Sequence, residues 1–264
     1  MHQYTSLQTA STYLVAIILL VFIMLSFVAG HQLRKGVIKR DPMRSIPEIN
    51  PINGMLLGLL GLLLAFSFSM SNSRFDDRRH LIIEEADVIG TTILRTDMYP
   101  DSMRAALRSA LRDYVERRIA FYETGTNVEK ALSEYSAAQV ESAKVWRMAV
   151  DYAKKDTSAN TTRTSQLIPS INDMIDIAST RLAAGEGTIP GSIMYFLFAL
   201  CLCASFLLGY ERTGKVDWIS LGGFALTLSI TVFSILDLDR PRSGLIKMDG
   251  PNTKIIELRE MFDK

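Results

Sequence analysis

The sequence predicts an all-α integral membrane protein, with four transmembrane helices and a soluble helical bundle between the second and the third. The first observation is that apolar residues are concentrated in four runs, at residues 13–30, 51–70, 190–210 and 216–236. Each run has the roughly 17–25 residues that a helix needs to cross about 30 Å of hydrocarbon. The second observation is a polar stretch of more than a hundred residues between the two pairs of runs. The third is that no strand-period pattern of useful length interrupts the helical periodicity.

Composition and charge exclude several classes of protein. The 264 residues carry a formal net charge of +1 and no basic tract, so the electrostatic footprint of a nucleic-acid-binding protein is missing. His2, His31 and His80 are too scattered for a local metal motif. Cys201 and Cys203 lie inside the third apolar run, where a cysteine is usually a small buried hydrophobe. We therefore expect no cofactor, no metal centre and no triad hydrolase.

The first apolar run predicts an uncleaved span rather than a signal peptide. The preceding tail has no Lys or Arg, the run is longer than a typical signal-peptide core, and no small-residue cleavage site follows it. We expect this span to end at Gly30. The loop that follows carries basic residues and two prolines that break helices, namely Arg34, Lys35, Lys39, Arg40, Arg44, Pro42 and Pro47.

The second apolar run differs from the first in its small residues. Gly54 and Gly58 form a G-x-x-x-G pair, with Gly61 one turn further on, and such glycines let helices approach closely in lipid. We expect this face to pack against the first span or a neighbouring subunit. Serine alternates with phenylalanine or methionine over residues 66–71, which is consistent with either lipid contact or a pore.

The second helix is expected to continue out of the membrane without a linker and to end near Asp97. An apolar stripe at helical spacing supports this, formed by Ile82, Ala86, Ile89 and Ile93. The charged residues of the segment are expected to form solvated faces. The paired acids Asp76-Asp77 and Glu84-Glu85 are adjacent in sequence and so point in different directions, which favours surface roles over enzyme chemistry.

Three more soluble helices are expected, at residues 102–123, 128–155 and 166–184. An exposed loop is expected at residues 156–165, and Gly185–Gly187 offers a hinge into the third span. In the middle helix a surface rich in Ser and Ala is interrupted by Leu132, Tyr135, Val145, Trp146 and Ala149. The polar region is therefore predicted to be a bundle of about four helices.

These elements predict four regions along the chain. They are a first transmembrane pair (1–72), a soluble helical domain (73–189), a second transmembrane pair (190–236) and a C-terminal tail of short helix and coil (237–264). Counting Lys and Arg beside the spans does not decide orientation. The five basic residues of the first loop are opposed by Arg74, Arg78, Arg79, Arg181, Arg240 and Arg242.

Two short motifs resemble a known family. F-S-F-S-M-S-N-S-R-F-D-D-R-R at residues 66–79 resembles the second helix of bestrophin ion channels, where an apolar Gly/Phe segment continues into a charged cytosolic helix. With L-D-L-D-R-P-R-S-G at residues 236–244, essentially the whole chain resembles the bestrophin-like family of uncharacterised bacterial membrane proteins.

The resemblance implies a homopentameric ion channel in the bacterial inner membrane, with both termini and the helical domain in the cytoplasm. Leu62 and Phe66 match positions of the hydrophobic neck, whereas Gly58 departs from the bulky residue expected one turn away. Asp237 and Asp239 stand where eukaryotic bestrophins carry a calcium-binding acidic run. Because Leu238 separates these two acids, a helix-end polar pair is favoured over a calcium site.

The residues also support a channel on physical grounds. A ring of Leu62 and Phe66 side chains from several subunits would gate by dewetting. Polar side chains beyond the ring would hydrate ions, namely Ser67, Ser69, Ser71 and Asn72. At the mouth, Arg74, Arg78 and Arg79 would concentrate anions while Asp76 and Asp77 oppose them, so ion selectivity stays open.

Alternative functions remain open from the sequence. Arg74 and its neighbours are equally compatible with anchoring a helix end at the lipid headgroups. The apolar interiors of the four spans carry no charged residue, which weighs against a secondary transporter. A non-conducting, membrane-anchored helical scaffold or sensor that binds a protein partner is therefore the main alternative. Subunit number discriminates the two, because a pore lined by one helix per subunit requires a closed ring.

Overall fold

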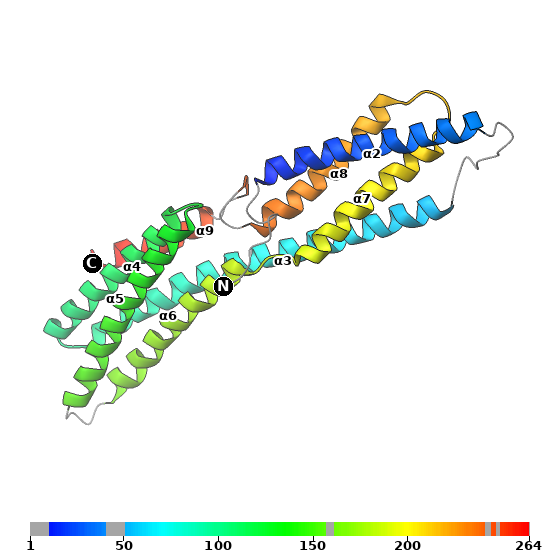
Figure 1. The fold of residues 1–264 in the computed structure, drawn as a ribbon. Coiled ribbons are helices and arrows are strands. Elements are labelled where there is room, and N and C mark those ends of the chain that lie inside the picture. Colours follow the sequence, from blue (N-terminus) through cyan, green and yellow to red (C-terminus); the bar gives the residue numbers. More distant parts are fainter. Residues whose placement is uncertain (1–10, 41–50, 157–160, 241–243, 247–248, 264) are drawn as a thin grey trace. The chain divides into compact units, whose positions relative to one another are not determined.

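The computed structural model describes residues 11–40, 51–156, 161–240, 244–246 and 249–263, and throughout these residues the ordered elements are helices (Figure 1). The N-terminal tail, Pro42, Arg44, Pro47, Arg242 and part of the expected loop at residues 156–165 lie outside them. In chain order the elements are α2 (Thr12–Arg40), α3 (Pro51–Arg95), η1 (Thr96–Met98), α4 (Asp101–Glu123), α5 (Val128–Lys155), α6 (Thr162–Glu186), α7 (Gly191–Glu211), α8 (Trp218–Asp239), α9 (Asp249–Glu257) and η2 (Leu258–Met261).

The chain divides into two compact units. The first unit comprises residues 1–74 and 188–240, and the second unit comprises residues 75–187 and 241–264. Four helical segments among the described residues are long and apolar enough to cross a membrane, and α2, α3, α7 and α8 supply their apolar parts. The all-α fold class is therefore confirmed, as is the continuity of the second helix, because α3 runs unbroken for 45 residues.

Helix α2 packs against α7 and α8 in the first unit (Figure 1). Two serine hydroxyls tie it to α7, because Ser26 donates to the carbonyl oxygen of Leu202 at 2.8 Å and Ser205 donates to that of Ile23 at 2.7 Å. A Cβ atom placed on Gly30 would lie 2.0 Å from the carbonyl oxygen of Phe206. The expectation that a loop begins directly after Gly30 is wrong. Gly30 lies within a helix that continues to Arg40. Because glycine has no side chain, the backbone of α7 can approach α2 closely at this position.

The second unit has the expected helical bundle. The predicted stripe Ile82, Ala86, Ile89 and Ile93 of α3 is buried, and it forms one core with residues of α4, α5 and α6. Helix α5 has the predicted bounds, whereas α6 begins four residues earlier than expected, at Thr162. Of the larger side chains that interrupt the Ser- and Ala-rich surface of α5, Leu132 is 46% exposed, whereas Val145 is fully buried, as is Ala149.

The C-terminal segment completes this core. Ile255 of α9 and Leu258 of η2 are buried in it. A Cβ atom placed on Gly90 of α3 would lie 3.5 Å from Leu258, which shows how closely the segment approaches α3. Arg108 of α4 donates to the carbonyl oxygen of Met261, and this bond fixes the end of η2. Of the expected tail at residues 237–264, residues 241–264 belong to the second unit, whereas residues 237–240 belong to the first.

Candidate functional site

The first half of α3 buries only one narrow stripe of side chains. Asn53, Leu60, Ser67 and Ser71 are buried, and their spacing of seven, seven and four residues places them on one side of the helix. The hydroxyls of Ser67 and Ser71 therefore point toward the interior of the chain, where they have no hydrogen-bond partner among the described residues. They do not share a surface with the expected neck residues.

The opposite side of α3 carries what we call the exposed stripe, formed by Met55, Leu62, Phe66, Ser69 and Ser73. Met55 is 75% exposed, Leu62 is 53% exposed and Phe66 is 61% exposed, and both serines are exposed as well. Their spacing of seven, four, three and four residues keeps them on one face. The stripe thus changes from apolar to hydroxyl-bearing along the helix. The structure brings Leu62, Phe66 and Ser69 together on it.

The small residues of α3 flank this stripe. A Cβ atom placed on Gly54, Gly58 or Gly61 would meet nothing within 4 Å. These glycines consequently do not pack against α2, and within the described chain the close helix approach occurs instead at Gly30 and Gly209. Asn72, the other residue expected near the pore, is also exposed and lies on this glycine-bearing side of α3.

The two arginines expected at the pore mouth differ in environment. Arg74 is partly exposed, and its Nη2 lies 3.8 Å from the sulfur of Met70. Arg78 is only 5% exposed, and it donates from Nε to the carbonyl oxygen of Ala184 at 3.1 Å and from Nη2 to that of Gly187 at 2.5 Å. Arg78 thereby caps the C-terminal end of α6, where a cation is favoured by the helix dipole. It is not on the exposed stripe.

The family of the chain follows from comparison with known proteins. A family model for a bestrophin-like domain matches residues 17–249. The chain belongs to the bestrophin-like family. The family expected from residues 66–79 and 236–244 is confirmed.

Solved structures show that this bestrophin-like protein has the bestrophin fold. A single-residue variant of a bacterial bestrophin homolog from Klebsiella pneumoniae matches with a TM-score of 0.70 at 12% identity, over 97% of this chain and 100% of that chain. A Klebsiella pneumoniae bestrophin homolog phased from zinc matches with a TM-score of 0.70 at 11% identity, over 94% and 98% of the two chains. No curated protein sequence matches at a comparable level of significance. Family and fold together make the chain a multi-pass membrane protein.

The two acids at the end of α8 are buried in this bestrophin-like protein. Asp237 is 1% exposed and Asp239 is 6% exposed. Both carboxylate oxygens of Asp239 accept from the backbone N–H of Ile189, at 3.1 and 2.9 Å, which fixes the chain just before α7. No group of three or more candidate metal ligands occurs among the described residues. Asp239 therefore acts at the end of α8, where it holds the backbone that leads into α7.

A buried ionic cluster in the second unit was not predicted. The expectation that Glu85 lies on the surface is wrong, because its side chain is fully buried. One of its oxygens accepts from Nε of Arg118 at 2.5 Å, and the other accepts from the hydroxyl of Tyr122 at 2.7 Å and from Arg181. The sequence did carry a signal for this burial. Glu85 stands three residues after Ile82 and four before Ile89, on the apolar stripe of α3.

The electrostatics of this cluster favour its charged form. Burial raises the pKa of Glu85, but the positive charges of Arg118 and Arg181 outweigh burial and lower that pKa to about 2. Burial raises the pKa of Tyr122, so its hydroxyl stays protonated and donates to Glu85. Burial alone would lower the pKa of Arg118, whereas the carboxylate of Glu85 raises it. The cluster is therefore a carboxylate shared by two guanidinium groups.

Proposed function

We propose that this bestrophin-like protein is an ion channel, assembled as a homopentamer in the bacterial inner membrane, with a hydrophobic neck lined by α3. The observation that carries the proposal is the exposed stripe of α3, on which Leu62 and Phe66 stand beside Ser69 and Ser73. Five is the subunit number implied by the resemblance to bestrophins. The second unit lies in the cytoplasm in this proposal.

A single subunit cannot form this pore by itself, since one helix does not enclose a path. Phe66 is 61% exposed within the chain, and the hydroxyls of Ser69 and Ser73 would be unfavourable against lipid. Both features are accommodated when the stripes of several subunits face a common axis. The open faces of Gly54, Gly58 and Gly61 lie on the flank of the stripe, where a neighbouring subunit's helix would pack closely.

Conduction would depend on the order of side chains along the stripe. The ring formed by Leu62 and Phe66 would resist wetting when narrow and admit ions when water fills it. Ser69, one turn further along α3, would supply hydroxyl ligands to ions leaving the ring, with Asn72 on the flank beside it. Arg74 would attract anions at that end. We assign Arg78 no role at the mouth in this proposal, because its Nε and Nη2 donate to carbonyl oxygens at the end of α6.

The test is subunit number and current measured on the same preparation. The full chain, purified in detergent, is examined by native mass spectrometry and then reconstituted into planar bilayers. A pentamer that gives discrete single-channel currents, with a reversal potential that shifts in a KCl gradient, is the expected result. A monomer or dimer without currents would overturn the proposal and leave the membrane-anchored scaffold that binds a protein partner.

A further inference from the structure

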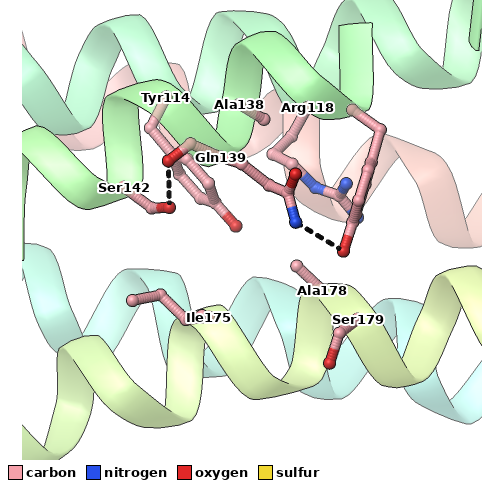
Figure 2. Close-up of a pocket in the computed structure, with 9 residues that line it drawn as sticks. Tyr114, Arg118, Ala138, Gln139, Ser142, Ile175, Ala178 and Ser179 are labelled. Carbon is pink, nitrogen blue, oxygen red and sulfur yellow. Dashed lines mark hydrogen bonds between the residues drawn. The ribbon is translucent and has the colours of Figure 1, made fainter. Parts of the chain in front are cut away.

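A small cavity lies beside the buried ionic cluster, between α4, α5 and α6. Its volume is about 50 Å³. Figure 2 shows Tyr114 and Arg118 pointing from above into the space over α6, which carries Ile175, Ala178 and Ser179. Tyr114 and Arg118 are almost completely buried, while Gln139 and Ser179 are exposed. The cavity therefore has a buried end formed by Tyr114 and Arg118 and an open end at Gln139 and Ser179.

The buried end offers hydrogen-bond donors that the protein leaves unused. Arg118 donates from Nε to Glu85 and from Nη2 to the hydroxyl of Tyr122 at 2.9 Å, whereas its Nη1 has no hydrogen-bond partner among the described residues. The hydroxyl of Tyr114 likewise has none. A buried donor without a partner is costly, and a guanidinium nitrogen more so than a neutral group. Both donors belong to residues that line the cavity.

Charge determines which kind of occupant suits this space. Within the cluster, two guanidinium groups share the single carboxylate of Glu85, so one positive charge is left over in a buried site. No carboxylate lines the cavity, whose remaining walls are formed by the side chains of Tyr135, Ala138, Ser142, Ile175 and Ala178. Three aromatic rings surround Arg118, at 4.9 Å for Phe121, 5.5 Å for Tyr122 and 5.9 Å for Tyr135, and provide only partial compensation.

We propose that this cavity binds one small monovalent anion of the size of chloride, held by Nη1 of Arg118 and the hydroxyl of Tyr114. The anion neutralises the excess charge of the Glu85–Arg118–Arg181 cluster. About 50 Å³ accommodates a halide ion but not an organic acid such as gluconate. The site lies wholly within the second unit and is separate from the exposed stripe of α3.

The first test is thermal unfolding of the full chain in detergent, in sodium chloride against sodium gluconate at equal ionic strength. Chloride or bromide is expected to raise the unfolding midpoint by several degrees with a saturable dose dependence, because the ion binds only the folded chain. Tyr114→Phe keeps the ring and removes one donor, so the half-saturating chloride concentration should rise about tenfold. Tyr99→Phe changes another buried tyrosine, one that does not line the cavity, and should leave that concentration unchanged.

Two results of this experiment would overturn the proposed anion site. The unfolding midpoint would then rise equally in gluconate, or Tyr114→Phe would show the same chloride stabilisation and the same half-saturating chloride concentration as the unchanged chain. Either result would mean that water occupies the cavity. A second measurement identifies the occupant directly. Crystals of the full chain grown in sodium bromide should show an anomalous peak beside Nη1 of Arg118, and density without an anomalous signal there would refute the proposal. Both readouts are independent of ion conduction.

Discussion

Glu85 of α3 and Arg118 of α4 form an ion pair whose side chains are 0% and 1% exposed, with 2.5 Å between the carboxylate oxygen and Nε. Such a pair is stable in the interior only when further hydrogen bonds satisfy both groups. Tyr122 and Arg181 supply those bonds to Glu85. The cluster thus connects α3, α4 and α6 through one carboxylate.

Replacing that carboxylate should destabilise the second unit strongly. Glu85→Gln leaves two guanidinium groups without a counter-charge, and breaking a buried pair typically costs about 3–5 kcal/mol. Glu84→Gln is the matched control, because Glu84 is the exposed neighbour and its substitution should change stability by less than about 0.5 kcal/mol. Unfolding midpoints of the full-length variants in detergent measure the difference. Equal midpoints for the two variants would contradict the role of Glu85.

Acid should weaken the fold through the same residue. The pKa of Glu85 is lowered in the folded chain from 4.5 to about 2, so the folded state prefers the charged carboxylate. The stabilisation is complete above the unfolded pKa of 4.5 and is lost progressively as the pH falls toward 2. The gap in unfolding midpoint between the unchanged chain and Glu85→Gln should therefore narrow with decreasing pH. A gap that stays constant down to the lowest pH at which the chain folds would refute this linkage.

The helices of the second unit could be predicted because their apolar periodicity is local. The bounds of α5 and the buried stripe Ile82, Ala86, Ile89 and Ile93 follow from residues within one helix. Glu85 was misplaced because periodicity assigns charged residues to the solvent. Its partners Arg118 and Arg181 stand 33 and 96 positions away, and their approach depends on the tertiary fold.

The close packing of the first unit could not be assigned from composition for a related reason. Gly54, Gly58 and Gly61 form the more conspicuous small-residue pattern, yet these positions are open in the structure. Gly30 and Gly209 are isolated glycines in separate spans, and only their meeting at the crossing of α2 and α7 gives them a function. On α3, the sequence did identify Leu62 and Phe66 as one face, because they are four residues apart.

The crossing of α2 and α7 should not tolerate even a methyl group. A Cβ atom on Gly209 would lie 2.0 Å from the carbonyl oxygen of Phe27, so Gly209→Ala must push two backbones apart. We expect a loss of about 1–3 kcal/mol and a lower unfolding midpoint. Gly36→Ala, in the open part of α2, should be neutral or slightly stabilising because alanine favours helix. Identical midpoints for Gly209→Ala and Gly36→Ala would show that the backbones do not meet there.

The C-terminal segment should be held by its apolar contact more than by its ion pair. Leu258 is 7% exposed in the core, so Leu258→Ala should cost about 2–5 kcal/mol. Arg259 binds Glu116 at 2.8 and 2.7 Å, but both side chains are nearly half exposed, and Arg259→Ala should cost less than about 1 kcal/mol. Limited proteolysis of the two variants checks this, with faster cleavage of the C-terminal segment expected in Leu258→Ala alone. Faster cleavage in Arg259→Ala alone would show instead that the ion pair, and not the apolar contact, holds the C-terminal segment.

The neck proposal makes a directional prediction for two phenylalanines of α3. Phe66 is on the exposed stripe, whereas Phe68, two residues later, points to a different side of the helix and is 44% exposed. Phe66→Ala widens an apolar ring and should raise single-channel conductance or open probability, because a wider constriction wets more readily. Phe68→Ala should leave the conductance unchanged. Recordings in symmetrical KCl compare the variants, and unchanged currents in Phe66→Ala would remove this residue from the conduction path.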